Sequence, residues 1–134
     1  MRWDVAVAAW LVPLTTDSDV TDLLGLDPQI DLVGERDFVV PSLEYTLVVP
    51  AQLFQEVYWR TLVQLDFWLE TIPDLVKLEK ALVRLLHFDT PTTFGAVPMW
   101  SEMIPGGGEL PGSKHGVRGG SLDFNLTYLR SVHS

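Results

Sequence analysis

The sequence of 134 residues contains no cysteine, few bases and no long apolar run. The absence of cysteine excludes disulfide bonds and thiolate zinc sites, and it leaves the redox compartment undetermined. Lysine and arginine total 9 against 18 aspartates and glutamates, which gives a formal net charge of −9. Arg36 is the only base between Trp3 and Glu56. Such a chain repels polyanions, which argues against a nucleic-acid-binding protein that neutralises phosphates with clustered cations.

Segments that could span or cross a membrane are also missing. No apolar run approaches the roughly 18 residues that a helix needs to cross a bilayer. The start, Met1-Arg2 followed by Val5–Leu14, superficially resembles a secretory signal, but Asp4 lies in the expected positive region and Pro13 interrupts the apolar run. We therefore expect a soluble protein that keeps this segment as a helix and makes no membrane contact.

The clearest pattern in the chain is a strand, a helix and a second strand. In Glu56–Glu70, apolar residues alternate with polar ones, which predicts a long strand with one buried face. Asp74–His87 places leucines at helical spacing behind Pro73. Leu122–Tyr128 alternates again. With 47% hydrophobic residues, residues 1–134 suit a single domain with its own core.

These patterns also predict which side chains meet between the sheet and the helix. The apolar face of each strand should point toward the leucines of the helix. The core residues expected on this basis are Leu65, Phe67, Leu78, Leu82, Leu85, Phe124 and Leu126.

The N-terminal segment from Trp3 to Leu14 is a predicted helix that is apolar on most of its sides. A helix of this kind is buried on more than one side, and a neighbouring subunit would supply the second side. We therefore expect Trp3 and Trp10 at or beside a subunit interface, where aromatic residues are enriched. Trp68 shares the polar face of the long strand with Asp66, so a helix or a partner is expected to cover it.

The rest of the chain is predicted to hold shorter elements. Thr16-x-x-Asp19 is a capping box that opens a short helix ending at Gly25. The other segments are a strand at Ile30–Val33, a connection at Gly34–Val40, a strand at Leu43–Val49 bracketed by Pro41 and Pro50, a connection at Ala51–Gln55, a loop at Phe88–Phe94, and a strand at Ala96–Ile104 whose Pro98 favours an edge.

The segment Pro105–Gly120 holds most of the 10 glycines, together with Lys114, His115 and Arg118. Its length and composition predict a loop, which is either functional or a simple disordered excursion. A basic loop on an acidic body suits an acidic partner surface, and its glycines would let it order only on contact. Lys114, His115 and Arg118 are therefore the candidate partner-contacting residues.

Candidate metal sites fail on spacing. Asp17-x-Asp19-x-x-Asp22 lacks the glycine and the closing glutamate of a calcium-binding loop, so helix capping explains it better. The 3 histidines lack the spacing of metal ligands. His87 falls in the last turn of the predicted helix, where a cation complements the helix dipole.

Candidate catalytic sites fail in the same way. The glycine-rich stretch lacks the Lys-Ser/Thr pair of a phosphate-binding loop, and Ser121 lacks the following glycine of a nucleophile elbow. Asp66 and Glu70 share a polar strand face, where solubility of an exposed sheet face explains them better than acid–base work. We therefore predict no catalytic, cofactor-binding or metal-binding residue, no cofactor, and no enzymatic activity.

Several segments, taken in order, carry a resemblance to a known family. They are Ala8-Ala9-Trp10-Leu11 with Asp19-Val20-Thr21-Asp22-Leu23-Leu24-Gly25, Pro41 before Leu43–Val49, Leu62-Val63-Gln64-Leu65-Asp66-Phe67-Trp68, Asp74–His87, and Ser121–Tyr128. In this order and spacing the chain resembles the tail terminator or tail-completion proteins of long-tailed bacteriophages, also called tail-to-head joining proteins.

This resemblance implies an α+β fold in which helices cover a curved, antiparallel β-sheet, in a single-domain, ring-forming subunit. It implies a homohexameric ring that caps the tail tube, ends its polymerisation and joins the tail to the head. The implied partners are further copies of the chain, the major tail tube protein and the head-tail connector or stopper protein, while genomic DNA passes through the lumen without specific binding. The implied location is the head-proximal end of the virion's tail, after assembly in the host cytoplasm.

Two other functions remain open at this point. A helix-covered curved sheet with an aromatic pocket of Trp59, Phe67, Phe124 and Tyr128 could bind a small molecule or act as an enzyme. Against this stands the lack of a convergent set of titratable residues. The second alternative is a head-side stopper or a baseplate subunit of the same kind of particle.

Overall fold

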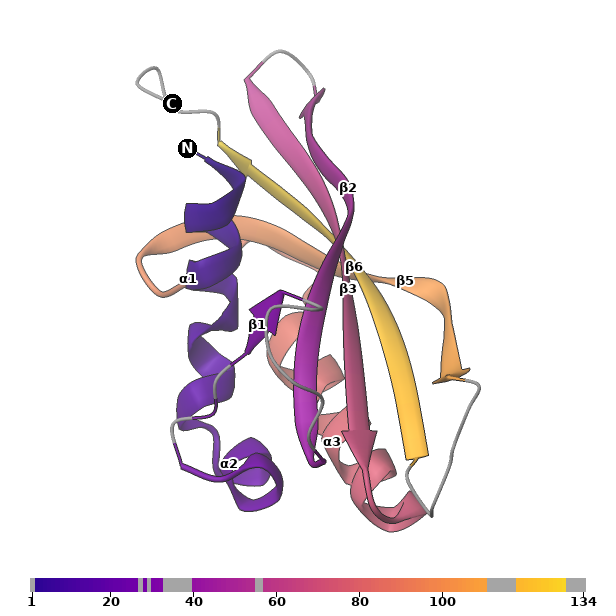
Figure 1. The fold of residues 1–134 in the computed structure, drawn as a ribbon. Coiled ribbons are helices and arrows are strands. Elements are labelled where there is room, and N and C mark those ends of the chain that lie inside the picture. Colours follow the sequence, from indigo (N-terminus) through magenta and orange to yellow (C-terminus); the bar gives the residue numbers. More distant parts are fainter. Residues whose placement is uncertain are drawn as a thin grey trace.

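The computed structural model describes residues 2–26, 28, 30–32, 40–54, 57–110 and 118–129, with the backbone alone described at 49–54, 105–110 and 118. Its helices are α1 (Trp3–Thr16), α2 (Ser18–Leu24) and α3 (Ile72–Leu86) (Figure 1). Its strands are β1 (Asp31–Leu32), β2 (Ser42–Phe54), β3 (Tyr58–Leu69), β4 (Thr92–Phe94), β5 (Val97–Leu110) and β6 (Arg118–Leu129).

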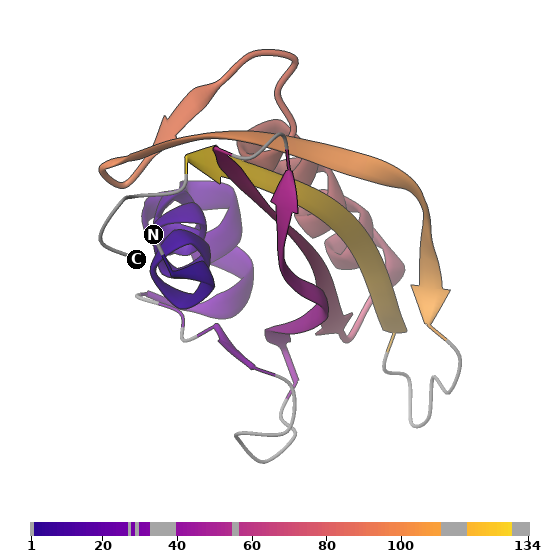
Figure 2. The ribbon, with the colours of Figure 1, turned by 90° about the horizontal axis from the view of Figure 1, so that it is seen from above.

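The strands form one six-stranded sheet in the order β1-β2-β3-β6-β5-β4. Every pairing is antiparallel except that of β1 with β2, which is parallel. The long strands bend, so the sheet is curved when it is seen from above (Figure 2). Helices α1 and α3 pack against each other and against the sheet. The predicted α+β class, with a mainly antiparallel sheet covered by helices, is confirmed.

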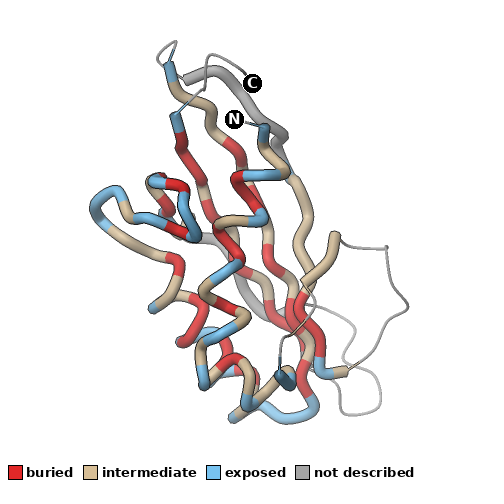
Figure 3. The backbone as a smooth tube through the Cα atoms, turned by 90° about the vertical axis from the view of Figure 1, so that its left-hand side faces the viewer, coloured by how far each residue is buried: buried red, intermediate tan, exposed pale blue. Residues whose placement is uncertain are grey.

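The core lies between the sheet and the two long helices. Along β3 the side chains alternate regularly between buried and half-buried from Thr61 to Leu69 (Figure 3). Pairing with β6 continues the same face, because Val63 lies opposite Phe124 and Leu65 opposite Leu122. The predicted core residues Leu65, Phe67, Leu78, Leu82, Phe124 and Leu126 are buried, and Leu85 packs at the edge of the core.

Helix α3 forms where its sequence supplies both a start and an apolar face. The Thr71 hydroxyl accepts a hydrogen bond from the backbone N–H of Asp74 at 3.2 Å, which caps the first turn. Pro73 sits in that turn, where its missing N–H costs nothing. The leucine face then meets β3, β5 and β6. The helix begins slightly earlier than the predicted range.

Helix α1 is held to the sheet by a buried hydrogen-bond chain. The indole N–H of Trp10 donates to the Ser101 hydroxyl on β5 at 2.8 Å, and that hydroxyl donates to the backbone carbonyl of Leu86 at the end of α3. The Trp10 ring also meets Phe124 edge to face, with ring centroids 5.3 Å apart. One side chain thus joins α1, α3, β5 and β6.

Two predicted boundaries are wrong: the start of α2 and the end of β2. Asp17, and not Thr16, caps α2, because its carboxylate accepts from the backbone N–H groups of Asp19 and Val20. Strand β2 does not end before Pro50 but continues to Phe54, through the predicted connection. Its register on β3 shifts between Val49 and Gln52, and such an irregularity accommodates a proline that has no N–H to donate.

The described parts of the predicted loop Pro105–Gly120, residues 105–110 and 118–120, are strand, and residues 111–117 lie outside the described residues. Strand β5 continues past Ile104 to Leu110, with a register irregularity between Ile104 and Gly108 that brackets Pro105. Strand β6 begins at Arg118. The predicted loop at Phe88–Phe94 likewise contains the short strand β4.

Two glycines in this segment are explained by rings on the neighbouring strand. Gly119 pairs with Trp68 and Gly120 with Phe67. A Cβ atom on Gly119 would lie 2.4 Å from the Trp68 ring, and one on Gly120 would lie 2.6 Å from the Phe67 ring. The glycines therefore make room for aromatic rings that cross the strand, one on each face of the sheet.

Truncation of Leu82 tests the placement of the helix face. Leu82 has no exposed surface. Leu82→Ala should lower the free energy of unfolding by about 2–5 kcal/mol, the usual range for a buried leucine. Urea denaturation measures this change, and a loss below about 0.5 kcal/mol, which is typical of surface sites, would contradict the assignment.

The two glycines offer a matched pair of variants. Phe67 is buried and cannot move aside, whereas Trp68 is half-buried and its ring has room to shift. Gly120→Ala should therefore cost about 1–3 kcal/mol of stability through overpacking, and Gly119→Ala should cost less. Thermal unfolding of both variants gives the order, and equal stabilities would show that the rings do not constrain the strand.

Candidate functional site

The sheet has one face that no described helix covers. We call it the bare face, because α1 and α3 both pack on the opposite side. Its side chains are those that alternate with the core positions of β2, β3, β5 and β6. Those used below are Glu44, Arg60, Leu62, Asp66, Trp68, Glu102, Ile104 and Asp123.

The bare face is acidic. Glu44 lies directly opposite Asp66 in the β2–β3 pairing, and like charges in this position repel each other. Asp123 lies opposite Gln64, whose side-chain amide donates to a carboxylate oxygen of Asp66 at 2.7 Å. Burial raises the pKa of Asp66, the Gln64 hydrogen bond lowers it, and the nearby Asp123 carboxylate raises it further. The carboxylates are thus crowded and partly desolvated.

Some polar atoms on this face are buried without satisfying their hydrogen bonds. The Ser42 hydroxyl and one carboxylate oxygen of Asp123 have no hydrogen-bond partner among the described residues. Ser42 is 3% exposed and lies opposite Trp68. Unsatisfied buried oxygens are rare in folded proteins and cost stability. Within one chain, the bare face therefore leaves some of its buried hydrogen-bonding atoms without partners among the described residues.

Trp68 is half-buried on the bare face, and its ring lies over Gly119. The sequence places Trp68 at a subunit interface, and that assignment stays a prediction. The ring packs within its own chain, because Gly119 has no Cβ atom to collide with it. Its remaining exposed side faces away from the helices.

Trp10 has a different position from the one expected at an interface. It is 0% exposed within the single chain, so a neighbouring subunit has no part of this side chain to contact. The apolar excess of α1 lies instead on its outer side, where Val5 is 50% and Val12 45% exposed. Together with the exposed Ala8 these residues form one stripe, the α1 stripe. Trp3 is half-buried beside the core.

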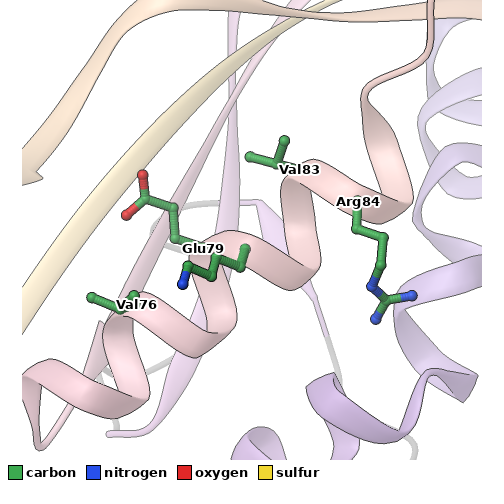
Figure 4. Close-up of a pocket in the computed structure, with 5 residues that line it drawn as sticks. Val76, Glu79, Val83 and Arg84 are labelled. Atoms are coloured by element: carbon green, nitrogen blue, oxygen red, sulfur yellow. The ribbon is translucent and has the colours of Figure 1, made fainter.

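Helix α3 also presents an outer surface. A shallow groove of about 430 Å³ is lined by Val76, Glu79, Lys80, Val83 and Arg84 (Figure 4). In the figure Arg84 points away from Val76, Glu79 and Val83, toward α2. It contacts the carboxylates of Asp17 at 3.0 Å and Asp19 at 3.2 Å.

The acidic cluster of α2 is thus accounted for by structural roles. Asp17 caps the helix and, with Asp19, pairs with Arg84 on α3. The interpretation as helix capping rather than a calcium loop is confirmed for Asp17. Within the described ranges no group of three or more His, Asp or Glu side chains is arranged to hold a metal ion. His87 ends α3, and its Nδ1 accepts a hydrogen bond from the backbone N–H of Met103 at 3.0 Å.

The aromatic pocket considered above is not formed by the residues named for it. Phe67 and Phe124 are fully buried in the core, where they fill space. Tyr128 is buried too, and its hydroxyl shares a 2.7 Å hydrogen bond with Thr61. A cleft of about 200 Å³ does exist at the end of the sheet, lined by Tyr58, Pro91, Pro98, Met99, Trp100, Tyr128 and Leu129. Its polar side-chain groups are tyrosine hydroxyls and an indole.

The structure does not describe the side chains of the predicted partner-contacting residues. Lys114 and His115 lie outside the described residues, and Arg118 is described only by its backbone, which pairs with Leu69 at the start of β6. Sequence reasoning missed the bare face as a site. The alternation along β3 carried a usable signal, since Gln64, Asp66 and Trp68 all fall on one side of it. No described helix is both long and apolar enough to cross a membrane.

Neutralising Asp66 tests the crowding on the bare face. The folded-state pKa of Asp66 is raised, so its protonation favours the folded state and that stabilisation is lost as pH rises through the folded pKa. At pH 7, Asp66→Asn should raise stability by less than about 1 kcal/mol, because the group is partly exposed. Below the unfolded pKa of about 4, parent and variant should converge. Melting curves from pH 3 to 8 measure this, and a less stable variant at pH 7 would refute the crowding.

Comparison with known proteins identifies a similar fold but no matching family. No protein-family model matches the chain, and no curated sequence resembles it. Among solved structures, a chain from the "virion of native gene transfer agent (GTA) particle" superposes with a TM-score of 0.61 at 11% identity. The match covers 96% of this chain and 100% of that one. At this identity the likeness establishes a shared fold over nearly the whole length of both chains.

Proposed function

We propose that this protein is a structural component of a phage-like virion. The observation that carries the proposal is the fold shared, over almost the full length of both chains, with a protein of a gene transfer agent virion. The net charge of −9 supports it, because an acidic protein lets DNA pass without binding it. The described residues bring no nucleophile, base and oxyanion donors together, which favours work by assembly over catalysis.

Within the virion, we place the protein at the head-proximal end of the tail. There it forms a homohexameric ring that caps the tail tube, ends tube polymerisation and joins the tail to the head connector. The support for this finer role is the order of sequence segments that resembles tail terminator proteins. A single-domain subunit with an exposed apolar stripe on α1 also suits a ring, in which each copy covers part of its neighbour. The partners are further copies, the tube protein and the head connector.

Particles made without the protein test the proposed role. A host that produces the particle but lacks this chain should yield free heads and separate tails, with tails of uncontrolled length because nothing ends tube growth. Negative-stain electron microscopy gives both readouts, and the parent chain supplied in trans should restore joined particles. Normal joined particles without the protein would refute the proposal. Tails of normal length that fail to join would favour a head-side stopper, and missing baseplates would favour the baseplate alternative.

A charge on the α1 stripe tests whether that stripe takes part in assembly. Val12→Asp places a carboxylate on the stripe and should weaken subunit association at least tenfold, about 1.4 kcal/mol, because the charge must be desolvated. Val12→Thr keeps the side-chain shape and should still assemble. Analytical ultracentrifugation measures association, while circular dichroism shows that both variants fold. Unchanged assembly of folded Val12→Asp would remove the stripe from the interface.

A further inference from the structure

Two described surfaces of opposite charge lie on opposite sides of the same layer of the fold. Helix α3 packs its leucines on β3, β5 and β6, so its outer side points away from the sheet. The bare face is the reverse side of these same strands. The outer side of α3 and the bare face therefore lie on opposite sides of the molecule.

The outer side of α3 carries two lysines against one exposed carboxylate, Glu79, with apolar side chains between them. Lys77 and Lys80 are exposed, and neither has an ion-pair partner among the described residues. Ile72 is 55% and Val76 40% exposed beside them. Helical spacing puts these side chains on one stripe, opposite the buried leucines. We call this surface the α3 stripe, and it is a cationic stripe on a chain whose net charge is −9.

The bare face has the complementary character. Its carboxylates Glu44, Asp66, Glu102 and Asp123 outnumber its described cation, Arg60. Half-buried Leu62, Ile104 and Trp68 give it apolar area between the charges. Glu44 and Asp66 repel each other across the strands, so a cation brought between them would relieve a cost that a single chain carries.

We propose that the α3 stripe of one copy docks on the bare face of the next copy, with Lys77 and Lys80 of the first meeting Glu44 and Asp66 of the second, which lie opposite each other on neighbouring strands. This inference rests on the proposed function, because it names the contact that builds the ring. Two different surfaces on opposite sides make a heterologous, head-to-tail contact, and repetition of such a contact closes a ring when the rotation between copies permits. Charge complementarity sets the register of the two surfaces and excludes the contact of a surface with itself.

Charge exchange between the two surfaces tests the contact. The helix variant carries Lys77→Glu and Lys80→Glu, and the sheet variant carries Glu44→Lys and Asp66→Lys. Each alone should fail to assemble, with association weakened at least tenfold, because like charges then face each other. An equimolar mixture should assemble again into particles with alternating copies, since each contact in the mixture pairs opposite charges. Native mass spectrometry distinguishes the two copies by mass.

A matched control separates the site of a charge change from its size. Asp22→Lys with Asp89→Lys alters the net charge as much as the sheet variant does, at exposed positions outside both surfaces. This control should assemble as the parent does. If either single-surface variant assembles like the parent, or if the mixture fails to recover assembly, the proposed contact is wrong. If the sheet variant still assembles with itself but no longer binds a basic tube or connector protein that the parent binds, the bare face belongs to that partner and the proposal is overturned.

Cross-linking gives an answer even if rings form only on the tail. The chain has no cysteine, so single cysteines can be placed at will. Lys80→Cys and Glu44→Cys proteins, treated with a short bis-maleimide at high concentration, should yield dimers when mixed and few when separate. A chain with both changes should give a ladder of multimers. Equal self-linking of Lys80→Cys alone would overturn the head-to-tail contact, while the knockout phenotype judges the virion role independently.

Discussion

The pairing of β3 with β6 at the centre of the sheet is the constraint on which the rest of the structure depends. It runs from Tyr58 opposite Leu129 to Leu69 opposite Arg118 without an irregularity. A slip of one residue would exchange the two faces of a strand. Gly119 and Gly120 oppose slipping, because only they leave room for the rings of Trp68 and Phe67. The register thus decides which side chains meet the helices and which are left on the bare face.

The consequences of this register reach both sides of the sheet. On the core side, Phe124 is positioned to meet Trp10, and the hydrogen bonds from Trp10 to Ser101 and onward to Leu86 then fix α1 against α3. On the other side, carboxylates from four strands are gathered without a covering helix among the described residues. A monomer gains nothing from such crowding, whereas a subunit with a cationic neighbour does. The same pairing that builds the core therefore creates a surface suited to assembly.

Strands and helices with a regular apolar period could be predicted from the sequence, as β3, α3, β6 and most of the core were. The failures have local physical causes. Pro50 and Pro105 were read as the ends of strands, but register irregularities let the strands continue around them. The sequence predicts a loop at Gly119-Gly120. The aromatic rings that require these glycines lie on β3, about fifty residues earlier in the chain, and only the pairing of β3 with β6 brings rings and glycines together. The burial of Trp10 within its own chain could not be predicted, because the sequence does not show that the distant Ser101 hydroxyl accepts its N–H. The bare face could not be predicted from the sequence, because its side chains come from four strands whose register only the structure gives.

The central claim is that copies of this chain form a ring between tail and head. Cryo-electron microscopy of the head–tail junction in intact particles measures this most directly, because it locates the chain and counts its copies at once. The account predicts a ring of six copies at the head-proximal end of the tube, with α3 of each copy on the sheet of the next. A junction without this chain, or copies found elsewhere in the particle, would contradict the account.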